Sequence, residues 1–151
     1  MHEPAEADEE AIRSLIVAYA ERLDAGDLDG VADLFTDGEF RSSRGGAPRV
    51  GRDAVRRQYD AVLVYDDGTP RTKHVLGDVV VDRDADGETA TARCTFTVFQ
   101  QAPGGPLRPV LAGCYHDRFA RVDDEWRFRE RVVHPDLIGD LSIHMGRRGR
   151  A

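Results

Sequence analysis

The chain has 151 residues, of which 28 are acidic and 21 basic, so its formal net charge is −7. This length corresponds to one domain, which can bury a core without a disulfide or a metal to hold it together. The acidic balance argues against a nucleic-acid-binding protein, and the lack of an apolar run of about 18 residues argues against a membrane span.

The first residues and the cysteines indicate the compartment. Residues 1–6 lack the basic and apolar regions of a signal peptide. The two cysteines, Cys94 and Cys114, are too few for a disulfide framework, so we expect reduced thiols. We therefore expect a cytoplasmic protein that contacts neither nucleic acid nor membrane.

The first predicted element is an amphipathic helix that ends near Gly26. Acidic residues 8–10 suit its N-terminus, where the helix dipole favours negative charge. We expect residues 1–7 to be a flexible lead-in. The apolar residues that share one face of this helix are Ile12, Leu15, Ile16, Tyr19, Ala20 and Leu23.

Three weaker elements follow in the next part of the chain. Helical spacing predicts short helices at residues 28–35 and 52–63, and residues 39–43 suit a short strand. Residues 42–51 are rich in Ser, Gly, Arg and Pro, which is typical of a loop.

Four long runs rich in Val, Thr, Phe and Tyr dominate the second half of the chain. The breaks between them are short and turn-like, so we expect the runs to pair as antiparallel hairpins. At 9 to 16 residues they exceed the usual strand length of about 5–6 residues, and Gly77 and Gly113 are the expected places for bulges. The runs cover Lys73–Asp82, Glu88–Gln101, Leu107–Val122 and Trp126–His134.

Helices followed by a meander of strands predict an α+β fold. We expect three N-terminal helices packed on a strongly curved antiparallel sheet, which together form a cone with a deep pocket. A single domain is expected over residues 8–145, with flexible termini at residues 1–7 and 146–151.

Two ionisable residues stand at the ends of predicted elements. Asp24 closes the first helix, where a carboxylate opposes the helix dipole at a cost of about 0.3–1 kcal/mol. His74 opens the first long strand. An Asx turn into Gly26 and a structural histidine are the alternatives. If the two side chains pair, the carboxylate fixes one imidazole tautomer, and His74 becomes a general base near pH 7.

Other candidates for the pocket lie on the strands and the first helix. Arg131 either belongs to a solvated face paired with acids or points inward to hold an oxyanion or a carboxylate. Tyr19 and Tyr115 either pack in the core or donate a hydroxyl into the pocket. The predicted apolar lining consists of Phe40, Phe96 and Val98.

The sequence predicts neither a cofactor nor a metal. It contains no phosphate loop, dinucleotide fingerprint, nucleophile elbow or zinc-protease motif. A site of two histidines and a carboxylate, His116 and His134 with Asp117 or Asp136, is conceivable but has no ligand spacing to support it.

Several short segments carry a family resemblance when they are taken together. They are Ala11–Asp24, Gly26–Leu28, Phe35–Asp37, Gly51–Val55, Lys73–Gly77, Gly113–Asp117 and Trp126–Phe128, which leads to Arg131. In this order the chain resembles the SnoaL-like branch of the nuclear transport factor 2-like superfamily over about residues 11–135. The family fold is a curved antiparallel sheet packed by helices into a cone with an apolar pocket, in agreement with the expected architecture.

Within this family the chain is most similar to the group that contains scytalone dehydratase and hexachlorocyclohexane dehydrochlorinase. The resemblance implies a cofactor-free elimination in which His74 is the base and Asp24 orients it, with Arg131 as the pocket arginine. Phe40 falls where the dehydrochlorinase has a tryptophan. That enzyme has a lysine where this chain has Tyr19, and scytalone dehydratase has a tyrosine where this chain has Leu23, so neither substrate is carried over. The resemblance also implies a homodimer or homotrimer.

The leading hypothesis is a lyase, isomerase or cyclase that takes a proton from carbon in a small, largely apolar molecule. Tyr19, Arg131 or Tyr115 would stabilise charge on the departing or enolising oxygen. The alternative is a non-catalytic small-molecule-binding or accessory protein of the same fold, in which Asp24 and His74 form a buried structural pair. A third hypothesis is an epoxide hydrolase-like activity in which Arg131 holds Asp24.

Overall fold

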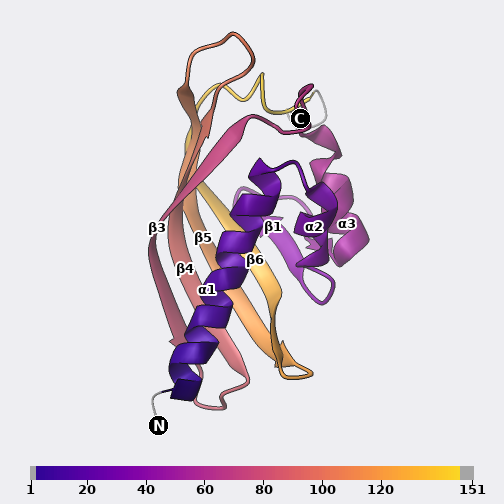
Figure 1. Ribbon diagram of the computed structural model, residues 1–151. Helices are drawn as coiled ribbons and strands as arrows, with labels where there is room; N and C mark the ends of the chain where they lie inside the picture. The colour runs from indigo at the N-terminus through magenta and orange to yellow at the C-terminus, as the bar shows by residue number, and fades with distance from the viewer. Residues whose placement is uncertain (1–2, 147–151) are drawn as a thin grey trace.

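The structure, a computed structural model, describes residues 3–146. Figure 1 shows the helices on the concave side of a strongly curved sheet, which confirms the predicted α+β fold. The helices are α1 (Glu3–Asp24), α2 (Leu28–Asp33) and α3 (Arg52–Gln58), which continues into the 3₁₀ turn η1 (Tyr59–Ala61). The strands are β1 (Glu39–Ser42), β2 (Arg49–Val50), β3 (Thr72–Arg83), β4 (Thr89–Gln100), β5 (Arg108–Val122) and β6 (Glu125–Ile138).

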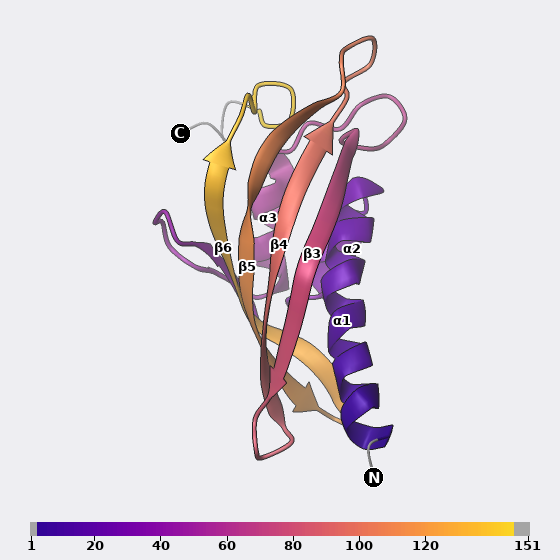
Figure 2. The same cartoon turned by 90° about the vertical axis from the view of Figure 1, so that its left-hand side faces the viewer.

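The six strands follow the order β2-β1-β6-β5-β4-β3 across the sheet. Strands β3 to β6 pair as the predicted antiparallel hairpins, and Figure 2 shows their outer face, with α1 beside β3. Strand β1 departs from the antiparallel expectation because it pairs in parallel with β6, to which no hairpin joins it. Strand β2 lies in the predicted loop, since two residues are too few to show a strand pattern.

Bulges occur at both predicted glycines. The register shifts between Gly77 and Val80 on β3, and also opposite Ala112 and Gly113, where β6 carries the extra residue Asp136. At Gly113 an added Cβ atom would overlap the carbonyl oxygen of His134, so the close approach of β6 requires a glycine there. Each bulge increases the local twist and helps these long strands to curve around the helices.

Helix α1 packs its predicted apolar face against the concave side of the sheet. Ile12, Ile16, Tyr19 and Leu23 are all buried in the core. Their spacing of three or four residues brings them onto one side of the helix, which is the pattern read from the sequence. This packing fixes the position of Asp24, the last residue of the helix, relative to the sheet.

The start of α1 differs from the expected lead-in, because the helix already begins at Glu3. Pro4 is tolerated there, since the N–H groups of a first helical turn have no partner within the helix. Asp8 binds the next turn of this helix to strands β5 and β6. Its Oδ1 accepts hydrogen bonds from Arg121 at 2.7 Å and from the Trp126 indole at 2.9 Å.

Some boundaries also differ from the predicted ones. The third helix ends at Gln58 and gives way to η1 instead of reaching residue 63. The flexibility predicted for residues 1–2 and 147–151 lies outside the described residues. Within residues 3–146, none of the helices combines the length and the apolar character that crossing a membrane requires.

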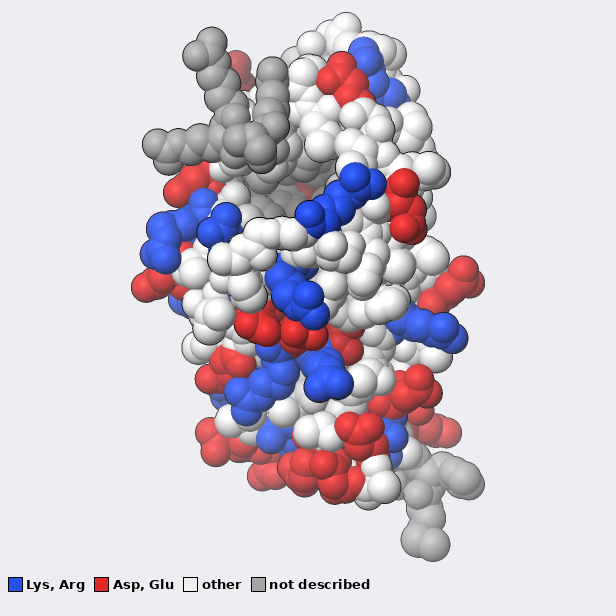
Figure 3. Space-filling view, turned by 180° about the vertical axis from the view of Figure 1, so that it is seen from behind, with Lys and Arg blue, Asp and Glu red and all other residues white. Residues whose placement is uncertain are grey.

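Charged side chains are interleaved on the face shown in Figure 3. Red and blue atoms alternate across its lower half, so the described residues there form no continuous field of one sign. A nucleic-acid-binding face needs such a positive field to neutralise phosphates.

Candidate active site

The end of α1 and the start of β3 bring Asp24 and His74 into direct contact. The Oδ1 atom of Asp24 lies 2.5 Å from the Nδ1 atom of His74, and its Oδ2 accepts a hydrogen bond from the His74 backbone N–H at 2.8 Å. The hydroxyl of Thr72 donates to Oδ1 at 2.9 Å. The carboxylate therefore binds β3 through both oxygens and does not form the alternative turn into Gly26.

These contacts decide where the protons of the pair reside. Burial raises the pKa of Asp24, but the hydrogen bonds and the charge of His74 outweigh burial and hold this pKa below its usual value. An ionised carboxylate only accepts hydrogen bonds, so the Nδ1 atom of His74 carries a hydrogen, and the lone pair of the neutral imidazole is on Nε2. The side chains of His74 and Asp24 are 5% and 16% exposed, so water competes little for their hydrogen bond.

A cavity of about 130 Å³ has His74 in its wall. An engineered apolar cavity of about 150 Å³ holds benzene, so this space accepts roughly one six-membered ring. Its lining residues include no Lys, Arg, Asp or Glu within the described part of the chain. The residues expected from the sequence that lie on this wall are Tyr19, Phe40, Phe96, Val98, Tyr115 and His74.

Three tyrosine rings meet at the cavity. The hydroxyls of Tyr19 and Tyr59 lie 2.6 Å apart and share a hydrogen bond. Tyr115 stacks on Phe96, with ring centroids 4.3 Å apart. Burial raises the pKa of Tyr19, Tyr59 and Tyr115, so all three hydroxyls keep their hydrogens at neutral pH and remain donors.

Arg131 is fully buried but does not line the cavity. Its Nε and Nη2 atoms donate to the two carboxylate oxygens of Asp117, each at 2.8 Å. The guanidinium carbon lies 3.8 Å from the ring centre of Tyr115 and 4.4 Å from that of Tyr19. The guanidinium group thus packs against these two rings, a geometry that favours cation–π attraction.

A bulge turns Arg131 inward. Arg118 pairs with Glu130, whereas the next residue of β5 pairs with Phe128, so Arg129 is the extra residue of β6 and is exposed. This one-residue slip moves Arg131 to the inner face.

The expected contact between Arg131 and a substrate oxygen does not fit this geometry. Its carboxylate partner is Asp117, whereas the epoxide hydrolase-like hypothesis requires Asp24 in that place.

The structure adds three polar residues that sequence reasoning did not assign to the site, Gln58, Tyr59 and His144. In the sequence, Tyr59 is only one of the apolar positions of the third predicted helix. Its spacing does not predict that its hydroxyl contacts the hydroxyl of Tyr19. His144 lies beyond the last strand and reaches the cavity wall. No local pattern marks it, because only the path of the chain after β6 returns it to the cavity.

The conceivable metal site is not assembled. The rings of His116 and His134 do lie side by side, with centroids 4.3 Å apart. Asp117, however, points to the opposite face and binds Arg131. Within residues 3–146 no group of three or more His, Cys, Asp or Glu side chains is arranged to hold a metal ion. Cys94 and Cys114 are both free thiols.

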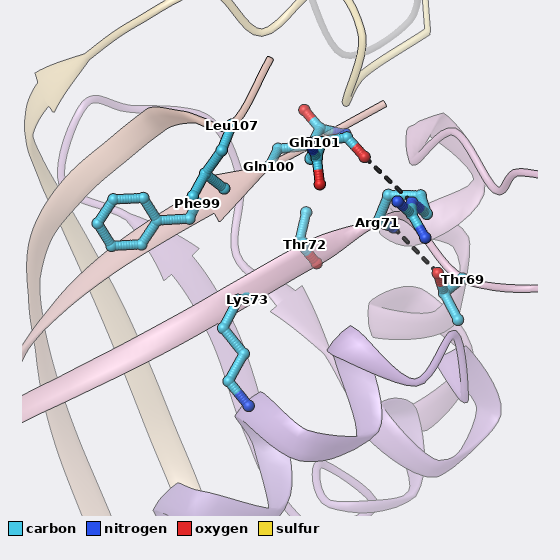
Figure 4. Close-up of a pocket in the computed structure, with 8 residues that line it drawn as sticks. All are labelled: Thr69, Arg71, Thr72, Lys73, Phe99, Gln100, Gln101 and Leu107. Carbon is cyan, nitrogen blue, oxygen red and sulfur yellow. Dashed lines mark hydrogen bonds between the residues drawn. The ribbon is translucent and has the colours of Figure 1, made fainter. Parts of the chain in front are cut away.

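A separate surface hollow lies where the facing ends of β3 and β4 meet (Figure 4). Arg71 donates from Nε to the carbonyl oxygen of Gln101 at 3.1 Å, and its backbone N–H donates to Thr69 at 3.1 Å. Thr72 borders this hollow and also binds Asp24, but His74 does not line it. The hollow therefore does not share the acid–base pair.

The sequence pattern of the SnoaL-like domain matches residues 5–132. The chain belongs to the SnoaL-like family. This confirms the resemblance read from the short segments. The SnoaL-like family has the nuclear transport factor 2-like fold and includes isomerases, cyclases and dehydratases, and its members bind small molecules and often oligomerise. No protein in the curated set matches the chain at a significant level.

Solved structures with this fold come from several bacteria. A nuclear transport factor 2-like protein with a cystatin-like fold from Novosphingobium aromaticivorans is 29% identical, with a TM-score of 0.72 over 87% of this chain and 83% of that one. A protein of unknown function from Mycobacterium tuberculosis is 25% identical, with a TM-score of 0.72 over 89% and 75%. A candidate scytalone dehydratase from N. aromaticivorans, 23% identical with a TM-score of 0.74 over 100% and 99%, shares the fold.

Proposed function

We propose that this SnoaL-like protein is a cofactor-free lyase, isomerase or cyclase in which His74 takes a proton from carbon. The observation that carries the proposal is the 2.5 Å contact between His74 Nδ1 and Asp24 Oδ1 at the wall of the cavity. Because Nδ1 is bonded to Asp24, the basic atom of the neutral imidazole is Nε2, which has the lone pair. The membership of isomerases, cyclases and dehydratases in the family supports the same reaction class.

The chemistry needs one base and one group of hydrogen-bond donors. The C–H bond beside a carbonyl breaks, its proton moves to His74 Nε2, and its electron pair moves toward the carbonyl oxygen. Asp24 stabilises the imidazolium that forms. The hydroxyls of Tyr19 and Tyr59 are uncharged donors suited to the developing enolate oxygen. Return of the proton from His74 to another carbon gives an isomer. Transfer of that proton to a β-hydroxyl group, which the enolate electron pair expels as water, gives an elimination.

The cavity limits the class of substrate. Its volume of about 130 Å³ suits a molecule of one ring, and its mostly apolar wall favours a largely apolar one. The described lining includes no cationic side chain, because Arg131 is paired with Asp117 outside the wall. An anionic substrate would lose its hydration without gaining a counter-ion, so we propose an uncharged ketone, with or without a hydroxyl group.

The test uses the β,γ-unsaturated isomer of cyclohexenone as a probe of suitable size. Conversion to the conjugated isomer is followed by ultraviolet absorbance, and uptake of solvent deuterium at carbon by NMR. We expect turnover in the natural chain and a loss of about 10²–10⁴-fold in His74→Ala. The control is His134→Asn, which changes a histidine beside His116, outside the cavity lining.

Equal rates in His74→Ala and His134→Asn would contradict proton abstraction by His74. Binding of the ketone by the natural chain with no deuterium uptake would instead support the alternative, a small-molecule carrier with the same cavity. In that case Asp24 and His74 are a structural pair, and Asp24→Asn lowers stability without changing any reaction.

We also infer that the chain forms a homodimer or homotrimer through the outer face of the sheet. Val75 and Val80 project from that face of β3 and are 49% and 37% exposed. Apolar side chains of this size gain free energy when a second copy covers them. Analytical ultracentrifugation of the natural chain and of Val80→Asp tests this inference, and two monomeric profiles would contradict it.

A further inference from the structure

The segment after β6 returns to the cavity and is held there by several hydrogen bonds. The backbone N–H of Leu63 donates to the His144 carbonyl at 2.8 Å, and that of Gly146 donates to the Ala61 carbonyl at 2.6 Å. The carbonyl of Ile143 accepts a hydrogen bond at 2.9 Å from the side chain of Gln100. The backbone on both sides of His144 is therefore fixed, and its ring has a defined place in the wall.

The ring of His144 has an unused hydrogen-bonding atom. The residue is 9% exposed, and among residues 3–146 its Nδ1 atom has no hydrogen-bond partner. A buried polar atom without a partner costs about 1–3 kcal/mol, so such an atom calls for an explanation. Burial, assisted by the nearby His74, lowers the pKa of His144 to about 4, which leaves the ring neutral at pH 7, with one donor and one acceptor nitrogen.

Three other ionisable side chains at the cavity already have hydrogen-bond partners. His74 is bonded to Asp24, and Tyr19 to Tyr59. His144 differs from these three because it lies on the same wall with a buried ring nitrogen that has no hydrogen-bond partner within residues 3–146.

We propose that His144 binds a hydroxyl group of the ligand, which is then a neutral, single-ring, hydroxylated molecule. A hydroxyl both donates and accepts, so it matches a neutral imidazole in either tautomer. This inference rests on the proposed function only in placing the ligand in the same cavity, and it does not depend on proton transfer to His74. His144 is on this view a specificity residue that distinguishes a hydroxyl from a methyl group of similar size.

Phenol and toluene are the probes, because they differ only in that group. Their dissociation constants are measured by NMR titration of the natural chain and of His144→Phe. The ratio of the toluene constant to the phenol constant should fall about three- to tenfold in His144→Phe, the loss expected for one neutral hydrogen bond. Met145→Leu, which changes the next residue of the wall while keeping its volume, should leave the ratio unchanged.

Two further measurements guard against a misfolded variant. His144→Gln keeps a donor and an acceptor and should retain part of the preference for phenol. In the natural chain, phenol should shift the ¹⁵N resonances of the His144 ring, whereas toluene should shift them less. An unchanged affinity ratio in a folded His144→Phe variant would overturn the proposal, as would an equal fall in Met145→Leu or a natural chain that binds neither probe.

The same titrations in His74→Ala separate this inference from the proposed function. Preference for phenol that persists in His74→Ala, together with no isomerisation by the natural chain, would refute proton abstraction and support the role of His144. Isomerisation that depends on His74, together with no dependence of the affinity ratio on His144, would refute only the hydroxyl-binding role.

Discussion

Replacing Asp117 with asparagine should strongly destabilise the fold, because it leaves the charge of Arg131 buried without a counter-ion. Both side chains are 0% exposed, and two hydrogen bonds of 2.8 Å join them. Burial lowers the pKa of Arg131, but the charge and hydrogen bonds of Asp117 outweigh burial and raise it, so the guanidinium stays charged in the core.

The expected loss in free energy of unfolding is about 3–5 kcal/mol, as for other buried ion pairs that lose one partner. In a chain of this size about 1 kcal/mol lowers Tm by roughly 2–4 °C, so Asp117→Asn should melt roughly 6–20 °C lower. Circular dichroism during thermal and denaturant unfolding measures both quantities. Asp37→Asn is the control, since it breaks a pair with Arg127 that is about one-third exposed and should cost at most about 1 kcal/mol.

A double variant tests the same reasoning from the other side. Asp117→Leu combined with Arg131→Met removes both charges and keeps most of the volume, so it should be more stable than Asp117→Asn alone. The reasoning is refuted if Asp117→Asn costs no more than Asp37→Asn, or if the double variant is the least stable of the three.

Two further predictions concern stability. Because the pKa of His144 is about 4 in the folded chain, against its ordinary 6.5, the unfolded chain binds the extra proton between these values. Stability should therefore fall as the pH drops from 6.5 toward 4, by at most about 3 kcal/mol, and denaturant titrations should show a shallower fall in His144→Gln. Gly113→Ala should destabilise by about 2 kcal/mol or more, since its Cβ would overlap backbone. Gly77→Ala meets only the hydroxyl of Thr95 at 3.0 Å and should cost clearly less in the same assay; equal losses would contradict the steric argument.

Local patterns in the sequence were enough to determine the main helix, the four long strands and one half of the site. The spacing of Ile12, Ile16, Tyr19 and Leu23 marks a helix face because a helix repeats every 3.6 residues or so, whatever lies opposite. The turn-like breaks between the four runs likewise determine antiparallel neighbours. Asp24 could be recognised as a candidate because its position at a helix end depends only on where that helix stops.

The tertiary structure decided to which face of the sheet each strand side chain points. It also decided which residues of the C-terminal segment join the cavity wall. One extra residue, Arg129, reverses the parity of β6 and moves Arg131 from the outer to the inner face of the sheet, where it binds Asp117. His144 reaches the wall only because its backbone bonds to Leu63, far away in the sequence. The register of the strands and the path of the segment after β6 depend on pairing between residues far apart in the sequence. Such pairing produces no periodic pattern in the local sequence, so only the folded chain determines it.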